Sequence, residues 1–258
     1  MPVASRRTFA GLGGGVLAAA LSASARGAAP SGLSADPASE AELGQTRYRT
    51  IDVGGLAIFY RHAGPAAAPV VLLLHGFPTS SRMFRNLIPM LADKYRVIAP
   101  DYPAFGHSAV PSRSDFHYTH AHLSEVVEAL IEKLGVTHFA MYVMDFGGPI
   151  GYRLMLKYPG RVTGVVIQNT PTFGEPTDGP LWAAELAYWK DGSPAHRDAV
   201  RFKLTPDAVR NQYLAGTREP SLIGPDNWTI DSGRFALEDH CAEIGALAHR
   251  FLQRVMPA

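Results

Sequence analysis

An aspartate at the end of an apolar segment is the residue of this sequence best placed for covalent chemistry. Asp145 follows the apolar run 139–144 and stands directly before Phe146-Gly147-Gly148 and a helix-like stretch. This order predicts a strand, a tight turn and a helix, with the carboxylate at the tip of the turn. A carboxylate is ionised at neutral pH, so it can attack an sp³ carbon without a base and form an ester. The alternative is that Asp145 caps the helix N-terminus, a position that aspartate favours.

The segments around Asp145 alternate between strand-like and helix-like patterns. Strand-like patterns cover residues 48–53, 56–62, 69–76, 95–103, 138–144 and 162–169, and helix-like patterns cover 80–93, 118–135, 150–162 and 241–255. Such alternation predicts right-handed βαβ crossovers and a mostly parallel sheet with helices on both faces. The predicted fold class is therefore α/β.

The composition excludes several classes of protein. The 258 residues are 47% hydrophobic and 18% charged with a formal charge of +1, which fits one apolar core and gives no basic surface for nucleic acid. The single cysteine, Cys241, excludes an internal disulfide. No pattern indicates a cofactor, and the expected partner is a small-molecule substrate.

The N-terminal residues 1–25 resemble a twin-arginine export signal. Arg6 and Arg7 precede a short apolar Gly/Ala-rich stretch that ends in a small-residue cleavage pattern, Ala23-Ser24-Ala25. The resemblance implies an exported protein, periplasmic or secreted, without membrane association after cleavage. The alternative is a disordered Ala/Gly tail with a chance arginine pair. Residues 26–45 are interpreted as a flexible lead-in.

Three motifs at the ends of successive predicted strands resemble the α/β-hydrolase superfamily, in its epoxide-hydrolase and haloalkane-dehalogenase branch. They are His75-Gly76-Phe77-Pro78, the segment 101–108 with the sequence DYPAFGHS, and Asp145 in a turn that resembles a nucleophile elbow. The resemblance implies an α/β-hydrolase core over residues 46–170, a helical lid over 171–231, and a loop and helix of the core over 232–258. No strand pattern follows residue 170, so the sheet is expected to be truncated at its C-terminal strands.

The resemblance also implies roles for individual residues. Asp145 would be the nucleophile, and the backbone N–H groups of Phe77 and Phe146 would form the oxyanion hole. Five residues would shape the surrounding turns rather than react: His75, Gly76, Pro78, Gly147 and Gly148.

The base that should hydrolyse the ester is missing from its expected place. Relatives place a histidine near the final helix, and the matching segment 232–238 carries Arg234 there, which stays protonated. His240 and His249 are the nearest substitutes, although a lone histidine on a helix is more often structural. Glu175 could replace the second acid, although a loop glutamate is the simpler interpretation.

The lid segment offers candidate substrate contacts, which could equally be packing residues: Tyr188, Tyr213, Trp182 and Trp189. Relatives that bind halide carry a tryptophan beside the nucleophile, where this chain has Phe146. This substitution favours an epoxide substrate. His117, His120 and His122 are spaced as a loose cluster, but a solvated helix start is expected there rather than a metal site.

Three functions remain open from the sequence. The first is hydrolysis of an epoxide or a carbon–halogen bond through an aspartyl ester, with the second half-reaction impaired. The second is a non-catalytic binding protein that retains the pocket, and the third is an incomplete gene product with an open sheet edge. The oligomeric state cannot be inferred.

Overall fold

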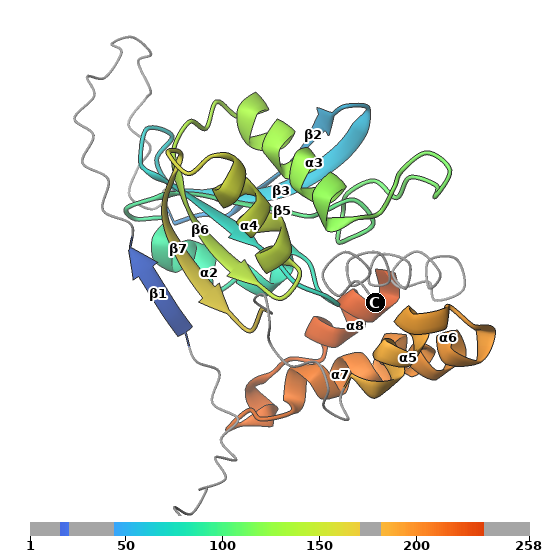
Figure 1. Ribbon diagram of the computed structural model, residues 1–258. Coiled ribbons are helices and arrows are strands. Elements are labelled where there is room, and N and C mark those ends of the chain that lie inside the picture. Colours follow the sequence, from blue (N-terminus) through green and yellow to red (C-terminus); the bar gives the residue numbers. More distant parts are fainter. Residues whose placement is uncertain (1–15, 21–43, 171–181, 235–258) are drawn as a thin grey trace, which may run out of the picture.

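The computed structural model describes residues 16–20, 44–170 and 182–234, which build a sheet covered by helices (Figure 1). Its strands are β1 (Val16–Ala20), β2 (Arg47–Val53), β3 (Leu56–Ala63), β4 (Val70–Leu74), β5 (Arg96–Pro100), β6 (Phe139–Met144) and β7 (Val162–Gln168). Within the described ranges their order in the sheet is β1-β7-β6-β4-β5-β3-β2. Strands β4, β5, β6 and β7 run parallel to one another. The predicted α/β class with a mostly parallel sheet is therefore confirmed.

Residues in the central strands alternate between two apolar clusters, one on each face of the sheet. Leu72 and Leu74 of β4 point into the larger cluster, whereas Leu73 between them belongs to the smaller one. A continuous apolar run of this kind is what a strand buried on both faces requires. The sheet therefore holds the ends of β4 and β6 rigidly, and both ends carry residues of the candidate site.

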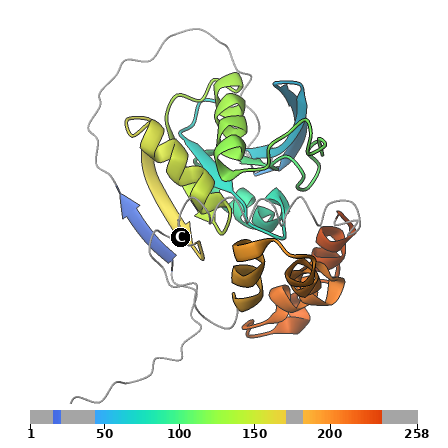
Figure 2. The same cartoon turned by 45° about the vertical axis from the view of Figure 1, so that its right-hand side comes forward.

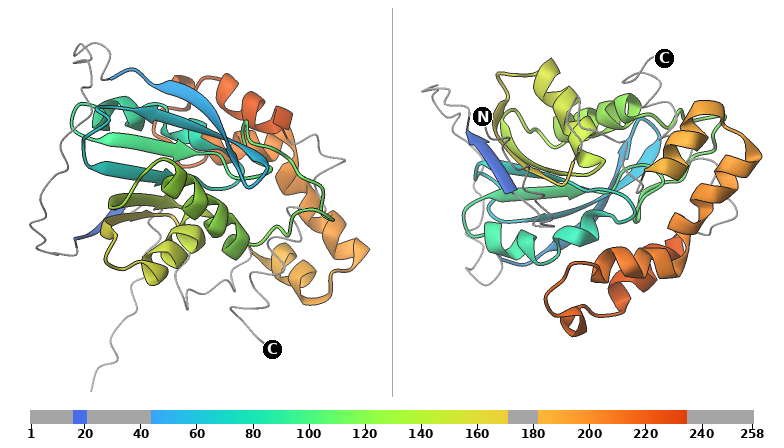
Figure 3. Two further views of the ribbon diagram at one scale, coloured as in Figure 1. Left: turned by 90° about the horizontal axis from the view of Figure 1, so that it is seen from above. Right: turned by 60° about the horizontal axis from the view of Figure 1, so that its bottom comes forward.

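Helices cover both faces of the sheet. Helix α3 (His120–Lys133) and helix α4 (Gly147–Lys157) lie side by side on one face, while the short η1 (Ser81–Phe84) and α2 (Leu87–Leu91) lie on the other (Figures 1 and 3). The single helix expected over 80–93 is thus divided into two short ones. Ser80 caps η1, because its side chain accepts a hydrogen bond from the N–H of Arg82.

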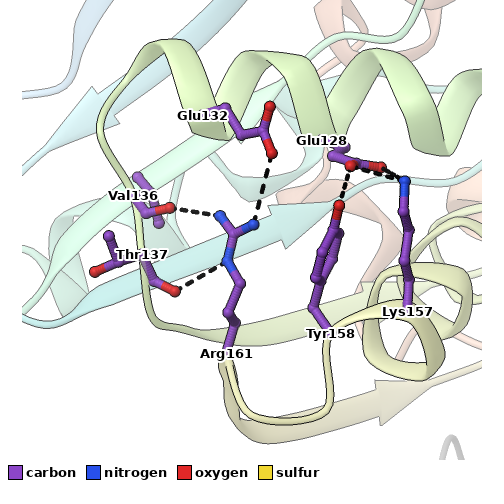
Figure 4. A network of polar contacts seen from close by, with 7 residues as sticks. All are labelled: Glu128, Glu132, Val136, Thr137, Lys157, Tyr158 and Arg161. Atoms are coloured by element: carbon purple, nitrogen blue, oxygen red, sulfur yellow. Dashed lines mark hydrogen bonds and ion pairs between the residues drawn. The ribbon is translucent and has the colours of Figure 1, made fainter.

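A polar network joins the C-terminal end of α3 to the loop after α4 (Figure 4). Glu128 accepts hydrogen bonds from Lys157 at 2.8 Å and from the hydroxyl of Tyr158. Arg161 donates to the carbonyl oxygens of Val136 at 2.7 Å and of Thr137 at 3.0 Å. Val136 and Thr137 lie three and two residues before β6, so the network fixes the start of the strand that leads to Asp145.

All described elements after β7 are helical and form a layer beside the C-terminal ends of the strands (Figures 1 and 2). They are α5 (Ala183–Asp191), α6 (Pro194–Arg201), η2 (Phe202–Leu204), α7 (Pro206–Leu214), η3 (Pro220–Leu222) and α8 (Asp226–Arg234). Helix α8 is continuous across the boundary between residues 231 and 232, where the sequence predicts the transition from lid to core. We call these elements the lid.

Strand β1 falls within the predicted export signal. It pairs antiparallel with β7, from Val16 opposite Gln168 to Ala20 opposite Gly164. The sequence pattern does not predict this strand, because an Ala-rich segment carries no alternation of apolar and polar residues. The arginine pair, the cleavage pattern and the lead-in up to residue 43 lie outside the described residues, so the export signal stays a prediction.

Candidate active site

Asp145 occupies a tight turn between β6 and α4. Its backbone has φ of 49°, in the left-handed region that non-glycine residues rarely adopt. Phe146 is the N-cap residue of α4, and no side chain makes a capping hydrogen bond there. Asp145 therefore stands one residue before the N-cap position of α4 rather than at it.

The carboxylate of Asp145 accepts hydrogen bonds from two backbone amides. The N–H of Phe77 donates to Oδ1 at 2.8 Å, and the N–H of Phe146 also donates to the carboxylate. Burial raises the pKa of Asp145 to about 6, because an ionised group loses its hydration there, and the two amide donors oppose that rise. The structure thus brings together the three residues that the sequence predicts for nucleophile and oxyanion hole.

Aromatic rings surround Phe146, the residue that follows Asp145 in the turn. The ring of Phe146 lies 5.8 Å from that of Phe77, 6.3 Å from that of Phe105 and 4.9 Å from the imidazole of His120. Such a setting weakens the competition of water for the carboxylate, so the two N–H donors interact with it more strongly than they would in solvent.

Two glycines allow the backbone to close around Asp145. A Cβ on Gly147 would lie 2.1 Å from the carbonyl oxygen of Leu74, at the end of β4. A Cβ on Gly148 would lie 1.8 Å from the hydroxyl oxygen of Thr170, after β7. Both positions therefore need glycine, which is the shaping role that the sequence predicts for them.

The motif after β4 is held by the segment after β5. His75 is fully buried, and its Nδ1 lies 3.0 Å from the carbonyl oxygen of Gly76, so Nδ1 carries the proton. Its Nε2 then accepts the N–H of Tyr102 at 3.4 Å. Burial lowers the pKa of His75 to about 4. His75 is therefore a neutral packing residue near the turn at Pro78, whose peptide bond with Phe77 is cis.

Asp101 also connects the segment after β4 with the segment after β5. Its carboxylate accepts the N–H of Ser81 at 2.7 Å and the N–H of His107 at 2.8 Å. Gly106 permits this contact with φ of 47°, since a Cβ there would lie 2.0 Å from Asp101 Oδ2. The motif 101–108 buttresses the site and presents no reactive group to it, as the resemblance implies.

The predicted lid residues have different surroundings. The hydroxyl of Tyr213 on α7 donates to the carboxylate of Asp231 on α8, and the side chain of Thr79 hydrogen-bonds to both groups. Trp182 packs under Lys203, whose Nζ lies 5.4 Å from the ring centroid. Tyr188 is partly buried on α5, while the side chain of Trp189 lies outside the described residues. The hydrogen bond with Thr79 places Tyr213 against the segment that follows Phe77.

The predicted substitutes for the base, His240 and His249, lie outside the described residues, as do Glu175 and the side chain of Arg234. Their roles stay predictions.

The prediction of a solvated helix start at His117, His120 and His122 does not hold for all three residues. His120 is buried at the beginning of α3, and burial lowers its pKa to about 3. This part of the prediction is wrong because α3 turns His120 towards Phe146, whereas His117 is exposed. Across the described ranges, no three His, Cys, Asp or Glu side chains gather as a metal site would require. Among the helices described, none is long and apolar enough to cross a bilayer.

Thr170 is a site residue that the sequence analysis did not identify. Its hydroxyl donates to the backbone carbonyl of Asp145 at 2.7 Å, across a separation of 25 residues. A hydrogen bond to a backbone atom leaves no pattern in the sequence. The indirect signal was Gly148, whose missing side chain makes room for that hydroxyl.

Residues 69–248 match the family described as alpha/beta hydrolase fold, and the chain belongs to this family. The chain is 40% identical over 189 residues to the Uncharacterized hydrolase YNR064C of Saccharomyces cerevisiae, which covers 72% of this chain and 64% of that protein. It is 34% identical over 204 residues to a haloalkane dehalogenase of Mycobacterium marinum, covering 72% of this chain and 68% of the relative.

Solved structures share the architecture. The epoxide hydrolase VrEH1 from Vigna radiata superposes with a TM-score of 0.60 and 25% identity, over 80% of this chain and 71% of that chain. The relatives are hydrolases, and they include dehalogenases and epoxide hydrolases. Because this chain spans 64% of the yeast hydrolase, the activity of the whole relative does not transfer to it directly.

Proposed function

We propose that this chain attacks an epoxide or a carbon–halogen bond with the carboxylate of Asp145 and forms an alkyl ester on it. The carrying observation is the hydrogen bond from the Phe77 N–H to Asp145 Oδ1 at 2.8 Å. This contact engages Oδ1 and supports attack by the other carboxylate oxygen, Oδ2. Relatives that act on haloalkanes and a structural neighbour that acts on epoxides support this assignment.

The bond changes are the same at both kinds of substrate. Oδ2 forms a bond to an sp³ carbon, and the electron pair of the carbon–halogen or ring carbon–oxygen bond leaves with the halide or the alkoxide. The alkoxide must then take a proton from an acid, whereas the halide needs none. Water finally cleaves the ester to an alcohol or a diol and restores the carboxylate.

The second half-reaction is proposed to be slow. By the resemblance of residues 232–238 to the family's histidine-bearing loop, Arg234 would stand where relatives carry the histidine that activates water, and a protonated arginine cannot accept a proton. Loss of a general base slows such a step by about 10²- to 10⁴-fold. The ester on Asp145 is therefore expected to accumulate.

Mass spectrometry of the intact protein tests this proposal. The chain is incubated with styrene oxide or with 1-bromohexane, and the modified peptide is then mapped. The expected result is one adduct on Asp145, with release of one bromide per adduct from the haloalkane. Asp145→Asn must abolish the adduct, and Asp93→Asn, at an exposed aspartate after α2, must leave it unchanged. An unmodified wild-type protein contradicts the proposal.

A further inference from the structure

The backbone conformation of Asp145 must be held by its surroundings. A φ of 49° places Asp145 in the left-handed region, where the Cβ of a non-glycine residue crowds the carbonyl oxygen. Such a conformation persists only where neighbouring contacts impose it. The contacts made by the backbone of Asp145 are therefore the place to look for what aims its carboxylate.

The carbonyl oxygen of Asp145 has two donors. The N–H of Gly148 donates at 3.0 Å within the first turn of α4, as the chain itself requires. The hydroxyl of Thr170 donates at 2.7 Å from the end of another strand. Thr170 is only 7% exposed, so little water can compete for this bond.

The chain reaches this geometry through a second unusual turn. Met144 of β6 is paired with Gln168 of β7 in the parallel register, and these are the last residues of their strands. The next residue on each strand, Asp145 and Asn169, has positive φ, at 49° and 44°. The turn at Asn169 brings Thr170 back towards β6, where its hydroxyl meets the Asp145 carbonyl.

The hydroxyl of Thr170 occupies the space that a side chain at position 148 would fill. A Cβ at this position would lie 1.8 Å from Thr170 Oγ1 and 2.8 Å from Thr170 Cβ. Any larger residue at 148 would displace Thr170 and break its bond to Asp145. The glycine, the threonine and the strained aspartate therefore form one arrangement, which we call the Thr170 clamp.

We propose that Thr170 is the positioning residue of the nucleophile: its hydroxyl fixes the backbone at Asp145 and thereby aims the carboxylate at the Phe77 N–H. This inference rests on the proposed function of Asp145. Thr170 acts through Asp145 and needs no contact with the substrate. It should therefore change how fast bound substrate reacts and leave substrate binding unchanged.

Two substitutions separate the hydroxyl from the rest of the side chain. Thr170→Val keeps the shape and removes the donor, while Thr170→Ser keeps the donor. Adduct formation with styrene oxide is measured over a range of concentrations, which separates the limiting rate from the half-saturating concentration. Thr170→Val is expected to lower the limiting rate about five- to tenfold at unchanged half-saturation. Thr170→Ser should remain within about twofold of wild type.

A matched control is Thr50→Val on β2, where the threonine is exposed. It should leave both constants unchanged. Wild-type reaction rates in Thr170→Val overturn the proposal, and so do equal losses in Thr170→Val and Thr170→Ser. A lower melting temperature in Thr170→Val with an unchanged limiting rate assigns the residue to stability alone, which also overturns it.

A second readout is independent of any reaction. In protein labelled with ¹⁵N-phenylalanine, the amide resonance of Phe77 follows the titration of Asp145 through their hydrogen bond. Loosening that bond raises the pKa of Asp145, so the midpoint should move to higher pH in Thr170→Val and stay in place in Thr170→Ser. If wild type forms no adduct, the proposed function fails, and an unmoved midpoint then overturns the Thr170 clamp separately.

Discussion

Gly76 and Asp145 lie so close together that a Cβ on Gly76 would stand 2.4 Å from the Cβ of Asp145. The same methyl group would lie 2.9 Å from Oδ1, the oxygen that the Phe77 N–H binds. Gly76 follows β4 and Asp145 follows β6, and neither backbone segment can move aside without disturbing the site. The absence of a side chain at Gly76 thus allows the carboxylate to reach its donor.

Gly76→Ala should therefore slow adduct formation strongly while the protein still folds. Displacing the carboxylate by about 1 Å is expected to slow adduct formation about 100-fold or more. The measurement is the adduct rate together with far-ultraviolet circular dichroism. Gly160→Ala is the matched control, since a Cβ there meets nothing within 4 Å. Near-wild-type reactivity of Gly76→Ala contradicts the described geometry.

Asp145→Asn should stabilise the protein at high pH. The raised pKa of about 6 means that the folded state binds the proton more tightly than the unfolded chain does. The resulting stability is complete below about pH 4 and is lost as the pH rises through 6, at a cost of about 3 kcal/mol. Asparagine keeps the acceptor and has no charge to bury, so the variant should gain up to that amount at pH 8. Urea unfolding at pH 4 and pH 8 tests this, and equal effects at both pH values contradict it.

The rate of ester formation should follow the ionisation of Asp145. Only the carboxylate attacks, so with 1-bromohexane the limiting rate should fall as the pH drops below about 6 and reach a plateau above it. A haloalkane is preferable to an epoxide here, because halide departure needs no proton. A rate that stays constant down to pH 4.5 contradicts the assignment of Asp145 as the titrating nucleophile.

Two buried histidines should destabilise the fold in acid. Burial lowers the pKa of His75 to about 4 and that of His120 to about 3, so the unfolded chain binds protons first as the pH falls below 6.5. Their contribution is lost with falling pH, opposite in sign to that of Asp145. The unfolding free energy of Asp145→Asn should therefore decline more steeply between pH 6.5 and 4 than that of wild type. Parallel curves would falsify this compensation.

Tyr213→Phe should loosen the lid. The change removes the donor to the buried carboxylate of Asp231, while Thr79 still hydrogen-bonds to it. Loss of a hydrogen bond to a charged group costs about 1.5–3 kcal/mol. Limited proteolysis within residues 206–234 should accelerate, and cleavage in the core should not. Asp231→Asn keeps an acceptor for Tyr213 and is expected to have the smaller effect. Identical proteolysis of Tyr213→Phe and wild type contradicts this role.

The fold could be predicted where local pattern and tertiary position agree. The run before His75 and the one before Asp145 are apolar throughout because both faces of β4 and β6 are buried, and that composition is visible in the sequence. Strand β1 could not be predicted in the same way. Its pairing with β7 depends on an edge contact, and nothing in its Ala-rich residues specifies that partner.

The candidate site could be predicted only in part. The motif residues mark the turns, so Phe77, Asp145 and Phe146 were expected to meet. The role of Thr170 could not be inferred, since its bond runs from a side chain to a distant backbone atom. The same holds for Tyr213 and Asp231, which meet because α7 and α8 pack against each other. Contacts of this kind depend on helix packing angles rather than on residue spacing.

The two amides at Asp145 have a consequence for substrate choice. They are the groups that a serine hydrolase would keep vacant for the carbonyl oxygen of an incoming carboxylic ester, but here the enzyme's own side chain already sits in that place. The carbonyl oxygen of an ester or amide substrate would therefore find both N–H donors already occupied by the Asp145 carboxylate. With Asp145 as the proposed nucleophile, we expect the site to disfavour acyl compounds and to favour attack at saturated carbon.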